Sequence, residues 1–137
     1  MRDPDCLFCK IVAGELPATI IAEDEHTISF MDINPATRGH ALVIPRGHAE
    51  DLLSIDSGDL REVIVAAQRL AGRAKERLGA AGVNLINSCG AAAWQSVFHF
   101  HLHVIPRYAN DPLKLPWTPA AGDPQEIAAI AQELAAG

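Results

Sequence analysis

The chain has 137 residues, of which 49% are hydrophobic and 20% charged, as expected for one globular domain with its own core. Its formal charge of −6 argues against a protein that binds nucleic acid along the backbone, because such binding needs a clustered basic surface; a small anionic ligand remains compatible. No apolar run approaches the roughly 18 residues of a membrane span, and residues 1–5 lack the features of a targeting signal. We therefore expect a cytoplasmic protein with neither a membrane nor a nucleic-acid partner.

The first third of the sequence predicts one short helix and three strands. Apolar residues with helical spacing predict a helix over residues 7–13, which a glycine and a proline end. Residues 19–22 and 26–32 are rich in β-branched side chains and have turn residues between them, as in paired strands. Residues 40–45 form an apolar run that stops at a proline, which indicates a central strand.

The rest of the sequence predicts a long helix, two strands and a terminal helix. Apolar residues recur at i, i+3, i+4 and i+7 over residues 59–78, the pattern of an amphipathic helix. Residues 83–87 and 97–105 read as strands separated by a Gly/Ala-rich turn. An alanine-rich segment near residues 124–136 predicts a short helix. This order of elements indicates an α+β domain with a mostly antiparallel sheet.

Three histidines occupy alternate positions in the last predicted strand. Strand geometry places His99, His101 and His103 on one face, and the alternate apolar residues on the other: Phe98, Phe100, Leu102 and Val104. Imidazole titrates nearest neutrality, so such a row suits a base, a nucleophile, an acid or a set of metal ligands. A solvated histidine-rich face and a zinc site are the alternatives.

The cysteines indicate reduced thiols and a metal half-site. Three cysteines are too few, and odd in number, for the disulfide framework of a secreted domain. Cys6 and Cys9 have the C-x-x-C spacing of a zinc half-site, which needs two further ligands. Two buried cysteines without metal are the alternative, whereas a thioredoxin-like redox pair is disfavoured because nothing strand-like precedes Cys6. Cys89 reads as an ordinary small residue.

The histidine row resembles a known family. Residues 95–105, Gln-Ser-Val-Phe-His-Phe-His-Leu-His-Val-Ile, resemble the His-x-His-x-His signature of the histidine triad (HIT) nucleotide hydrolases and transferases, in particular the branch of bacterial HIT-like and histidine-triad nucleotide-binding proteins. Residues 30–35, 39–45 and 46–48 are similar to the upstream blocks of the family, in the same order. The resemblance runs from about Cys6 to Arg107.

This resemblance implies an architecture. The expected fold is the α+β HIT-like fold, with a mostly antiparallel five-stranded sheet, one long helix and one short helix. The expected domain covers residues 1–110, and residues 111–137 form a C-terminal tail with a short helix. The resemblance also implies a homodimer in which the sheet continues from one subunit into the other.

The resemblance assigns catalytic roles to four histidines. His101 would attack the α-phosphorus and form a covalent nucleotidyl-histidine, with its Nδ1 proton held by the main-chain carbonyl of His99. His103 would stabilise charge on the phosphoryl oxygens, and His40 would support the triad from a neighbouring strand. Ser96 and Gln95 would add neutral hydrogen-bond donors.

The resemblance also implies the nucleotide contacts. Asp32 would accept hydrogen bonds from the ribose hydroxyls, although an acidic turn residue is the simpler alternative. Three apolar side chains would form walls for the base, unless they are plain core: Phe8, Ile28 and Ile33. Asn87 would contact ribose or phosphate, but its spacing from Gln95 is one residue longer than in the family pattern.

In bacterial relatives of this kind, a structural zinc can be held by the positions of Cys6, Cys9, His48 and His99. Four protein ligands leave no open position for water, so such a metal would stiffen the strand and would not take part in the chemistry. No organic cofactor is expected.

The expected reaction is hydrolysis of a purine nucleoside monophosphate that is linked at its phosphate to an amine, or of a related nucleotide. Three alternatives remain open: a dinucleoside polyphosphate hydrolase, a nucleotide-binding module without catalysis, and a zinc hydrolase that uses His99, His101 and His103 directly.

Overall fold

The computed structural model describes residues 3–137. Met1 and Arg2, the first two of the five residues in which no targeting signal was expected, lie outside the described residues. The elements follow in this order: α1 (Leu7–Val12), β1 (Ile20–Glu23), β2 (Thr27–Met31), β3 (Ala41–Pro45), α2 (Ser57–Leu78), β4 (Gly82–Ile86), the 3₁₀ turn η1 (Ala91–Ala93), β5 (Leu102–Arg107) and α3 (Pro124–Ala135). Among the described residues, no helix combines the length and apolar character needed to cross a bilayer.

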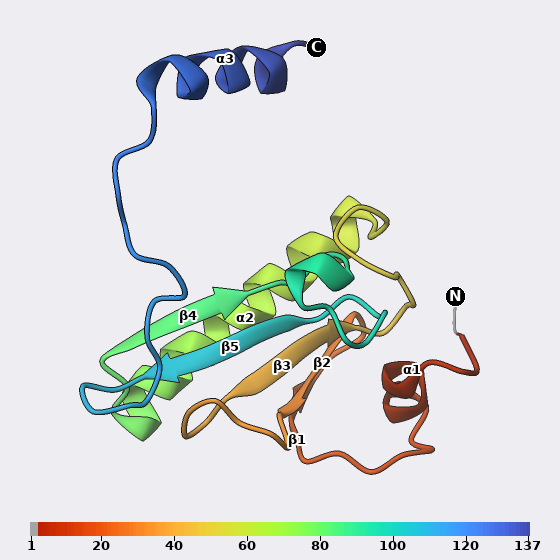
Figure 1. Cartoon of the computed structure of the whole chain (residues 1–137). Coiled ribbons are helices and arrows are strands. Elements are labelled where there is room, and N and C mark those ends of the chain that lie inside the picture. Colours follow the sequence, from red (N-terminus) through yellow and green to blue (C-terminus); the bar gives the residue numbers. More distant parts are fainter. Residues whose placement is uncertain (1–2) are drawn as a thin grey trace.

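The five strands form one antiparallel sheet, as predicted, and their order in it is β1-β2-β3-β5-β4. The long helix α2 lies across one face of this sheet, and α1 lies on the other side of it (Figure 1). Strands β2 and β3 are buried along nearly their whole length, whereas β1 and β4 form the two edges. The predicted α+β fold class is therefore confirmed.

Alternating side chains of β3 divide the core into two clusters. Leu42 and Ile44 pack with the α1 residues Phe8 and Cys9, while Val43 packs on the opposite face with α2. This division follows from the two-residue period of a strand. The sheet therefore has one face covered by the long helix and a second face on which the short α1 leaves room for a ligand.

The last strand begins later than predicted. Residues 97–99 are bent, and residues 100 and 101 belong to no regular element. Regular pairing of β5 starts at Leu102, because the Phe100 N–H donates to the Ala49 carbonyl at 2.7 Å instead of joining the ladder. The alternation still holds from His99 to Val104, with Phe100 buried beneath α2. Phe98, which was expected in the core, is 43% exposed, so that expectation was wrong.

The C-terminal helix stands apart from the sheet. An extended segment after β5 leads to α3, which lies away from the other elements in Figure 1. The Asp123 side chain caps its first turn, and none of its residues is buried. Its apolar residues Ile127, Ile130 and Leu134 are all exposed, at spacings that put them along one side of the helix.

Candidate active site and metal centre

A cavity of about 530 Å³ opens on the sheet face that carries α1. This volume is in the usual range for a small-molecule site. Apolar side chains from α1, β2 and β3 form most of its wall, and three histidines lie at its polar end: His40, His101 and His103. Asp32 is the only charged side chain, and among residues 3–137 no lysine or arginine lines the cavity.

The ring of His101 is held with one nitrogen protonated and the other bare. Its Nδ1 lies 2.8 Å from the carbonyl oxygen of His99. A carbonyl can only accept, so Nδ1 carries the proton and Nε2 of the neutral ring keeps a lone pair. Phe8 packs edge-on against this ring at 5.2 Å between centroids, and His101 is only 5% exposed.

Burial keeps His101 neutral. It lowers the pKa of His101 below its ordinary value of 6.5, against the opposing effects of the His99 carbonyl and the negative charge of Asp32. Desolvation penalises the charged imidazolium more than the neutral ring. At neutral pH the Nε2 lone pair is therefore free for nucleophilic attack.

His40 fixes the opposite tautomer on His103. The Ala36 N–H donates to Nδ1 of His40 at 2.9 Å, so the proton of the neutral His40 ring is on Nε2. That Nε2 lies 2.9 Å from Nδ1 of His103, to which it donates. The single N–H proton of the neutral His103 ring must then be on Nε2. A bare nitrogen and an N–H donor thus stand side by side on rings 5.1 Å apart.

His103 and His40 are also held neutral by their surroundings. Burial, with the neighbouring His101 and His40, lowers the pKa of His103 to about 4, although Asp32 opposes the shift. Burial likewise lowers the pKa of His40. The tautomers deduced for neutral rings therefore apply at physiological pH.

Asp32 combines a turn role with a place in the site. Its Oδ1 accepts from the Asn34 N–H at 2.8 Å, and its Oδ2 lies 3.4 Å from Nε2 of His40 and 4.0 Å from Nδ1 of His103. The carboxylate also lines the cavity. The turn role of Asp32 therefore occupies Oδ1, while Oδ2 faces the histidines.

The structure brings only some of the predicted nucleotide contacts to the cavity. Phe8, Ile33 and Ser96 line it, with Ile33 90% exposed at its mouth. Ile28 is instead buried in the core cluster on that side of the sheet and does not line the cavity. It therefore belongs to the core, which was the simpler interpretation.

Two side chains that were predicted to contact the nucleotide bind main-chain groups instead. The side-chain amide of Gln95 makes all of its hydrogen bonds with main-chain groups. Its Oε1 accepts from the Gly90 N–H, and its Nε2 donates to the carbonyls of Glu50 and Val97. Asn87 donates through Nδ2 to the carbonyl of His101 at 2.9 Å, while its buried Oδ1 has no partner among the described residues. Neither side chain lines the cavity. Both support the segment that carries His101.

A second group of side chains has the composition of a metal centre. Ligand atoms of Cys6, Cys9, His48 and His99 all lie within 4.8 Å of one another. Nδ1 of His99 is 3.3 Å from Sγ of Cys6, and Nδ1 of His48 is 3.4 Å from Sγ of Cys9. Tetrahedral zinc with sulfur and nitrogen ligands separates neighbouring donors by about 3.3–3.8 Å. The donors therefore fit a closed Cys₂His₂ zinc site.

The orientation of His99 suits a metal ligand. Its Nε2 donates to the Pro45 carbonyl at 2.9 Å, which leaves the Nδ1 lone pair facing the sulfurs. His99 is fully buried and does not line the cavity. Of its two expected roles, the side chain fits the metal set, and only its carbonyl reaches the His101 ring.

These positions disfavour a catalytic metal held by the triad itself. His99 points to the cysteines, while His101 gives its Nδ1 to a carbonyl. The second potential metal cluster among residues 3–137 comprises Asp32, His40 and His103 and lacks both of them. The three triad rings therefore do not converge on one ion.

The contact of Nδ1 of His101 with the His99 carbonyl was expected, but sequence reasoning missed two other main-chain groups that set tautomers. The Pro45 carbonyl orients His99 and the Ala36 N–H orients His40. No side-chain pattern marks such groups, because every residue other than proline carries both. Gly39 offered a weak signal: it precedes His40 with a φ of 88°, and a Cβ there would collide with Leu78.

Comparison with known proteins gives a consistent result. The HIT domain family matches residues 13–110. Protein hit of Bacillus subtilis (strain 168) is 37% identical over 134 residues, covering 96% of this chain and 92% of that protein. A zinc-bound histidine triad family protein from Mycobacterium smegmatis superposes with a TM-score of 0.78 at 42% identity, covering 94% of this chain and 95% of that one.

A third relative is a histidine triad nucleotide-binding protein from Candida albicans. Its structure matches with a TM-score of 0.83 at 30% identity, over 95% of this chain and 94% of that one. The family match covers well over half of the present chain. The chain therefore belongs to the HIT domain family.

Proposed function

We propose that the protein is a nucleotidyl hydrolase or transferase that acts at the α-phosphate of a purine nucleoside phosphoramidate, with His101 as the nucleophile. Membership of the HIT family supports the broader class of nucleotide hydrolases and transferases. The purine base and the phosphoramidate bond are the finer part of the proposal.

One observation carries it: the bond from Nδ1 of His101 to the His99 carbonyl, which leaves Nε2 bare at the polar end of the cavity. An uncharged imidazole with a fixed lone pair needs no base to activate it. The protonated Nε2 of His103, one position along the same face, is a donor for the phosphoryl oxygens as negative charge spreads over them.

The reaction then proceeds in two displacements. In the first, Nε2 of His101 forms a bond to phosphorus as the bond from phosphorus to the amine nitrogen breaks. The amine leaves with the electron pair and takes up a proton, for which the Ser96 hydroxyl at the cavity is a donor. In the second, water attacks phosphorus as the bond from phosphorus to Nε2 of His101 breaks, and a proton of the water returns to the Ser96 oxygen. The nucleoside monophosphate and the free His101 ring are released.

The charge of the cavity favours this substrate over a dinucleoside polyphosphate. Neutral histidines and Ser96 surround the polar end, Asp32 is negative, and no lysine or arginine among the described residues lines the wall. A chain of several phosphates would need cationic partners that this cavity lacks. A single phosphate can be held by neutral donors.

We further propose a structural zinc on Cys6, Cys9, His48 and His99. The metal would tie α1 to the segment that contains His99, whose carbonyl orients His101. The reducing cytoplasm, where we expect the protein to reside, would keep the two thiols available as ligands.

A homodimer is the third part of the proposal. Edge strand β4 exposes Leu85 and Ile86, and the adjoining turn of α2 exposes Ile64 and Val65. Ile64, Val65 and Leu85 line a shallow hollow of about 450 Å³. An apolar edge of this kind is a liability unless another strand covers it, and a second copy would continue the sheet.

Mass spectrometry of a trapped intermediate tests the nucleophile. Mixing the protein with adenosine 5′-phosphoramidate and quenching should give a nucleotidyl adduct on a peptide containing His101. His101→Asn should lose the adduct and at least about a thousandfold in kcat. His26→Asn, at an exposed turn histidine, is the matched control and should behave like the wild type. An adduct elsewhere, or full activity of His101→Asn, would remove the proposal.

Parallel assays separate the alternatives. Turnover of adenosine 5′-phosphoramidate should exceed turnover of a diadenosine polyphosphate at equal concentration, and the reverse order would favour a dinucleoside polyphosphate hydrolase. Tight nucleotide binding without turnover of either compound would favour a binding module.

A further inference from the structure

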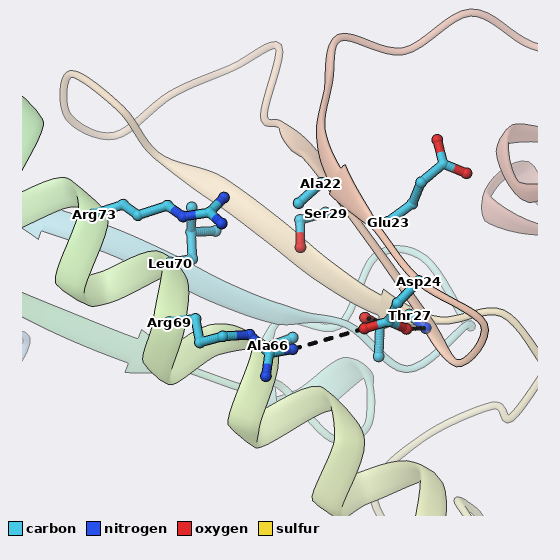
Figure 2. Close-up of a pocket in the computed structure, with 9 residues that line it drawn as sticks. All are labelled: Ala22, Glu23, Asp24, Thr27, Ser29, Ala66, Arg69, Leu70 and Arg73. Atoms are coloured by element: carbon cyan, nitrogen blue, oxygen red, sulfur yellow. Dashed lines mark hydrogen bonds and ion pairs between the residues drawn. The ribbon is translucent and has the colours of Figure 1, made fainter.

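A second hollow lies on the sheet face opposite the catalytic cavity, between α2 and strands β1 and β2 (Figure 2). Its volume is about 200 Å³. Ala22, Ala66 and Leu70 give it apolar walls. Its polar lining residues are two arginines, two acidic residues and two hydroxyl residues, and the proposed reaction makes no use of them.

Two arginines face this hollow from one side of α2. Arg69 and Arg73 are one helical turn apart, so their like charges repel each other. Arg69 has a loose ion pair with Asp24, at 3.7 Å between Nη2 and Oδ2. Arg73 has no ion pair or hydrogen bond within residues 3–137. The helix therefore presents more positive charge to the hollow than its own neighbours neutralise.

The acidic residues at the rim are committed elsewhere. Glu23 pairs with Arg46 at 2.7 Å, and Figure 2 shows its carboxylate turned away from the helix. Oδ1 of Asp24 accepts from the main-chain N–H groups of His26 and Thr27, at 2.8 Å each. Asp24 is thereby anchored to its turn, and a 3.7 Å contact between exposed groups is weak. An incoming anion can compete with it for Arg69.

A hydroxyl group on β2 faces the same hollow. Ser29 is 4% exposed in the middle of β2, on the face that packs toward α2, and its hydroxyl makes no hydrogen bond with the described residues. Figure 2 shows this hydroxyl pointing from the strand toward the arginines. Its oxygen is open to the hollow, so the hydroxyl is available to donate a hydrogen bond to a ligand there. An oxyanion between strand and helix would accept that bond.

We propose that this hollow binds a small phosphate-type oxyanion, either inorganic phosphate or the terminal group of a phosphomonoester, through Arg69, Arg73 and Ser29. Guanidinium groups match the oxygens of such an anion in geometry and charge. The volume of about 200 Å³ suits a phosphate group, whereas the catalytic cavity of about 530 Å³ suits a nucleotide. This proposal does not depend on the proposed reaction.

Residue-resolved NMR of the full chain tests the site. Inorganic phosphate is titrated at constant ionic strength, because salt screens exposed arginines. Amide signals around Ser29 and around Arg69 to Arg73 should shift together, apart from any response near His101. Shifts confined to the catalytic cavity would overturn the proposal.

Variants measure the contribution of each group. Arg73→Gln should weaken binding at this site by about tenfold or more, as expected for the loss of a charge-assisted bond. Ser29→Ala should also weaken it. Arg77→Gln, one turn further along α2 and outside the hollow, is the matched control and should bind like the wild type. Unchanged binding by Arg73→Gln would refute the site.

Glycerol 2-phosphate distinguishes the two sources of the anion. Tighter binding of this ester than of inorganic phosphate would identify a phosphomonoester as the ligand, and tighter binding of the inorganic ion would identify free phosphate. Failure of both to shift the signals around Ser29 would end the proposal.

Discussion

Nε2 of His40 lies 2.9 Å from Nδ1 of His103, and this contact determines which nitrogen of His103 carries its proton. The Ala36 N–H donates to Nδ1 of His40, so the N–H proton of the His40 ring is on Nε2. The result is an N–H on Nε2 of His103 beside the bare Nε2 of His101. The contacts made by Nδ1 of each ring therefore determine which Nε2 is an N–H donor and which keeps its lone pair.

Removing the donor at position 40 should therefore slow the chemical step more than it weakens substrate binding. His40→Leu leaves Nδ1 of His103 without its donor, so the ring can adopt the other tautomer. We expect kcat to fall by about tenfold to a hundredfold with little change in KM, as for other groups that orient reacting residues. Steady-state kinetics with a nucleoside phosphoramidate measure both constants.

The control for this prediction is His40→Gln, which keeps an amide donor on a side chain of similar length. It should retain more kcat than His40→Leu. Equal activity of the two variants would show that His40 acts by packing and not by fixing a tautomer.

The pH dependence of kcat/KM should report the lowered pKa of the buried His101. Attack needs the neutral ring, and burial lowers the pKa of His101 from 6.5. Activity should therefore stay on its plateau as the pH falls through 6.5 and decline only at lower pH. An acid limb centred at 6.5 or above would contradict this, and a substrate whose own pKa lies well below this range keeps the profile interpretable.

Metal analysis should find about one zinc ion per chain. Cys6→Ser should lose the metal, whereas Cys89→Ser, outside the cluster, should keep it. A metal present at 1,000 times its Kd stabilises the fold by about 4 kcal/mol. For a domain of this size, losing it should lower Tm by about 10 °C. Equal metal content and Tm in the two variants would refute the site.

Zinc removal also separates a structural metal from a catalytic one. Protein that has been stripped of metal and remains folded at low temperature should retain hydrolytic activity, because His101 attacks without a metal in the proposed reaction. Complete loss of activity with an unchanged fold by circular dichroism would instead favour a catalytic zinc.

A charge on the exposed edge strand should separate the expected dimer. Leu85→Glu places a carboxylate in the apolar hollow between β4 and α2, where a partner would bury it at high cost. Light scattering coupled to size exclusion should show a dimer for the wild type and a monomer for this variant. Leu53→Glu, at a leucine 86% exposed outside that hollow, should remain dimeric. A monomeric wild type would refute the proposal.

Much of the fold could be predicted from local patterns. The 3.6-residue period of residues 59–78 lies within α2, and the apolar run ending at Pro45 is the central strand β3. Such patterns succeed because each element has to bury one face. The start of β5 was predicted too early, because the pairing of Phe100 with Ala49 diverts the chain and depends on a loop that sequence periodicity does not describe.

The sequence by itself determined that His99, His101 and His103 project to one side of an extended segment, because side chains alternate along it. It also identified Cys6 and Cys9 as candidate metal ligands by their C-x-x-C spacing. Only the tertiary structure decided the role of each ring. His99 faces the cysteines because the Pro45 carbonyl holds its other nitrogen, and His103 presents an N–H because His40 holds its Nδ1. The chemistry of an imidazole depends on its proton, and partners distant in the sequence place that proton.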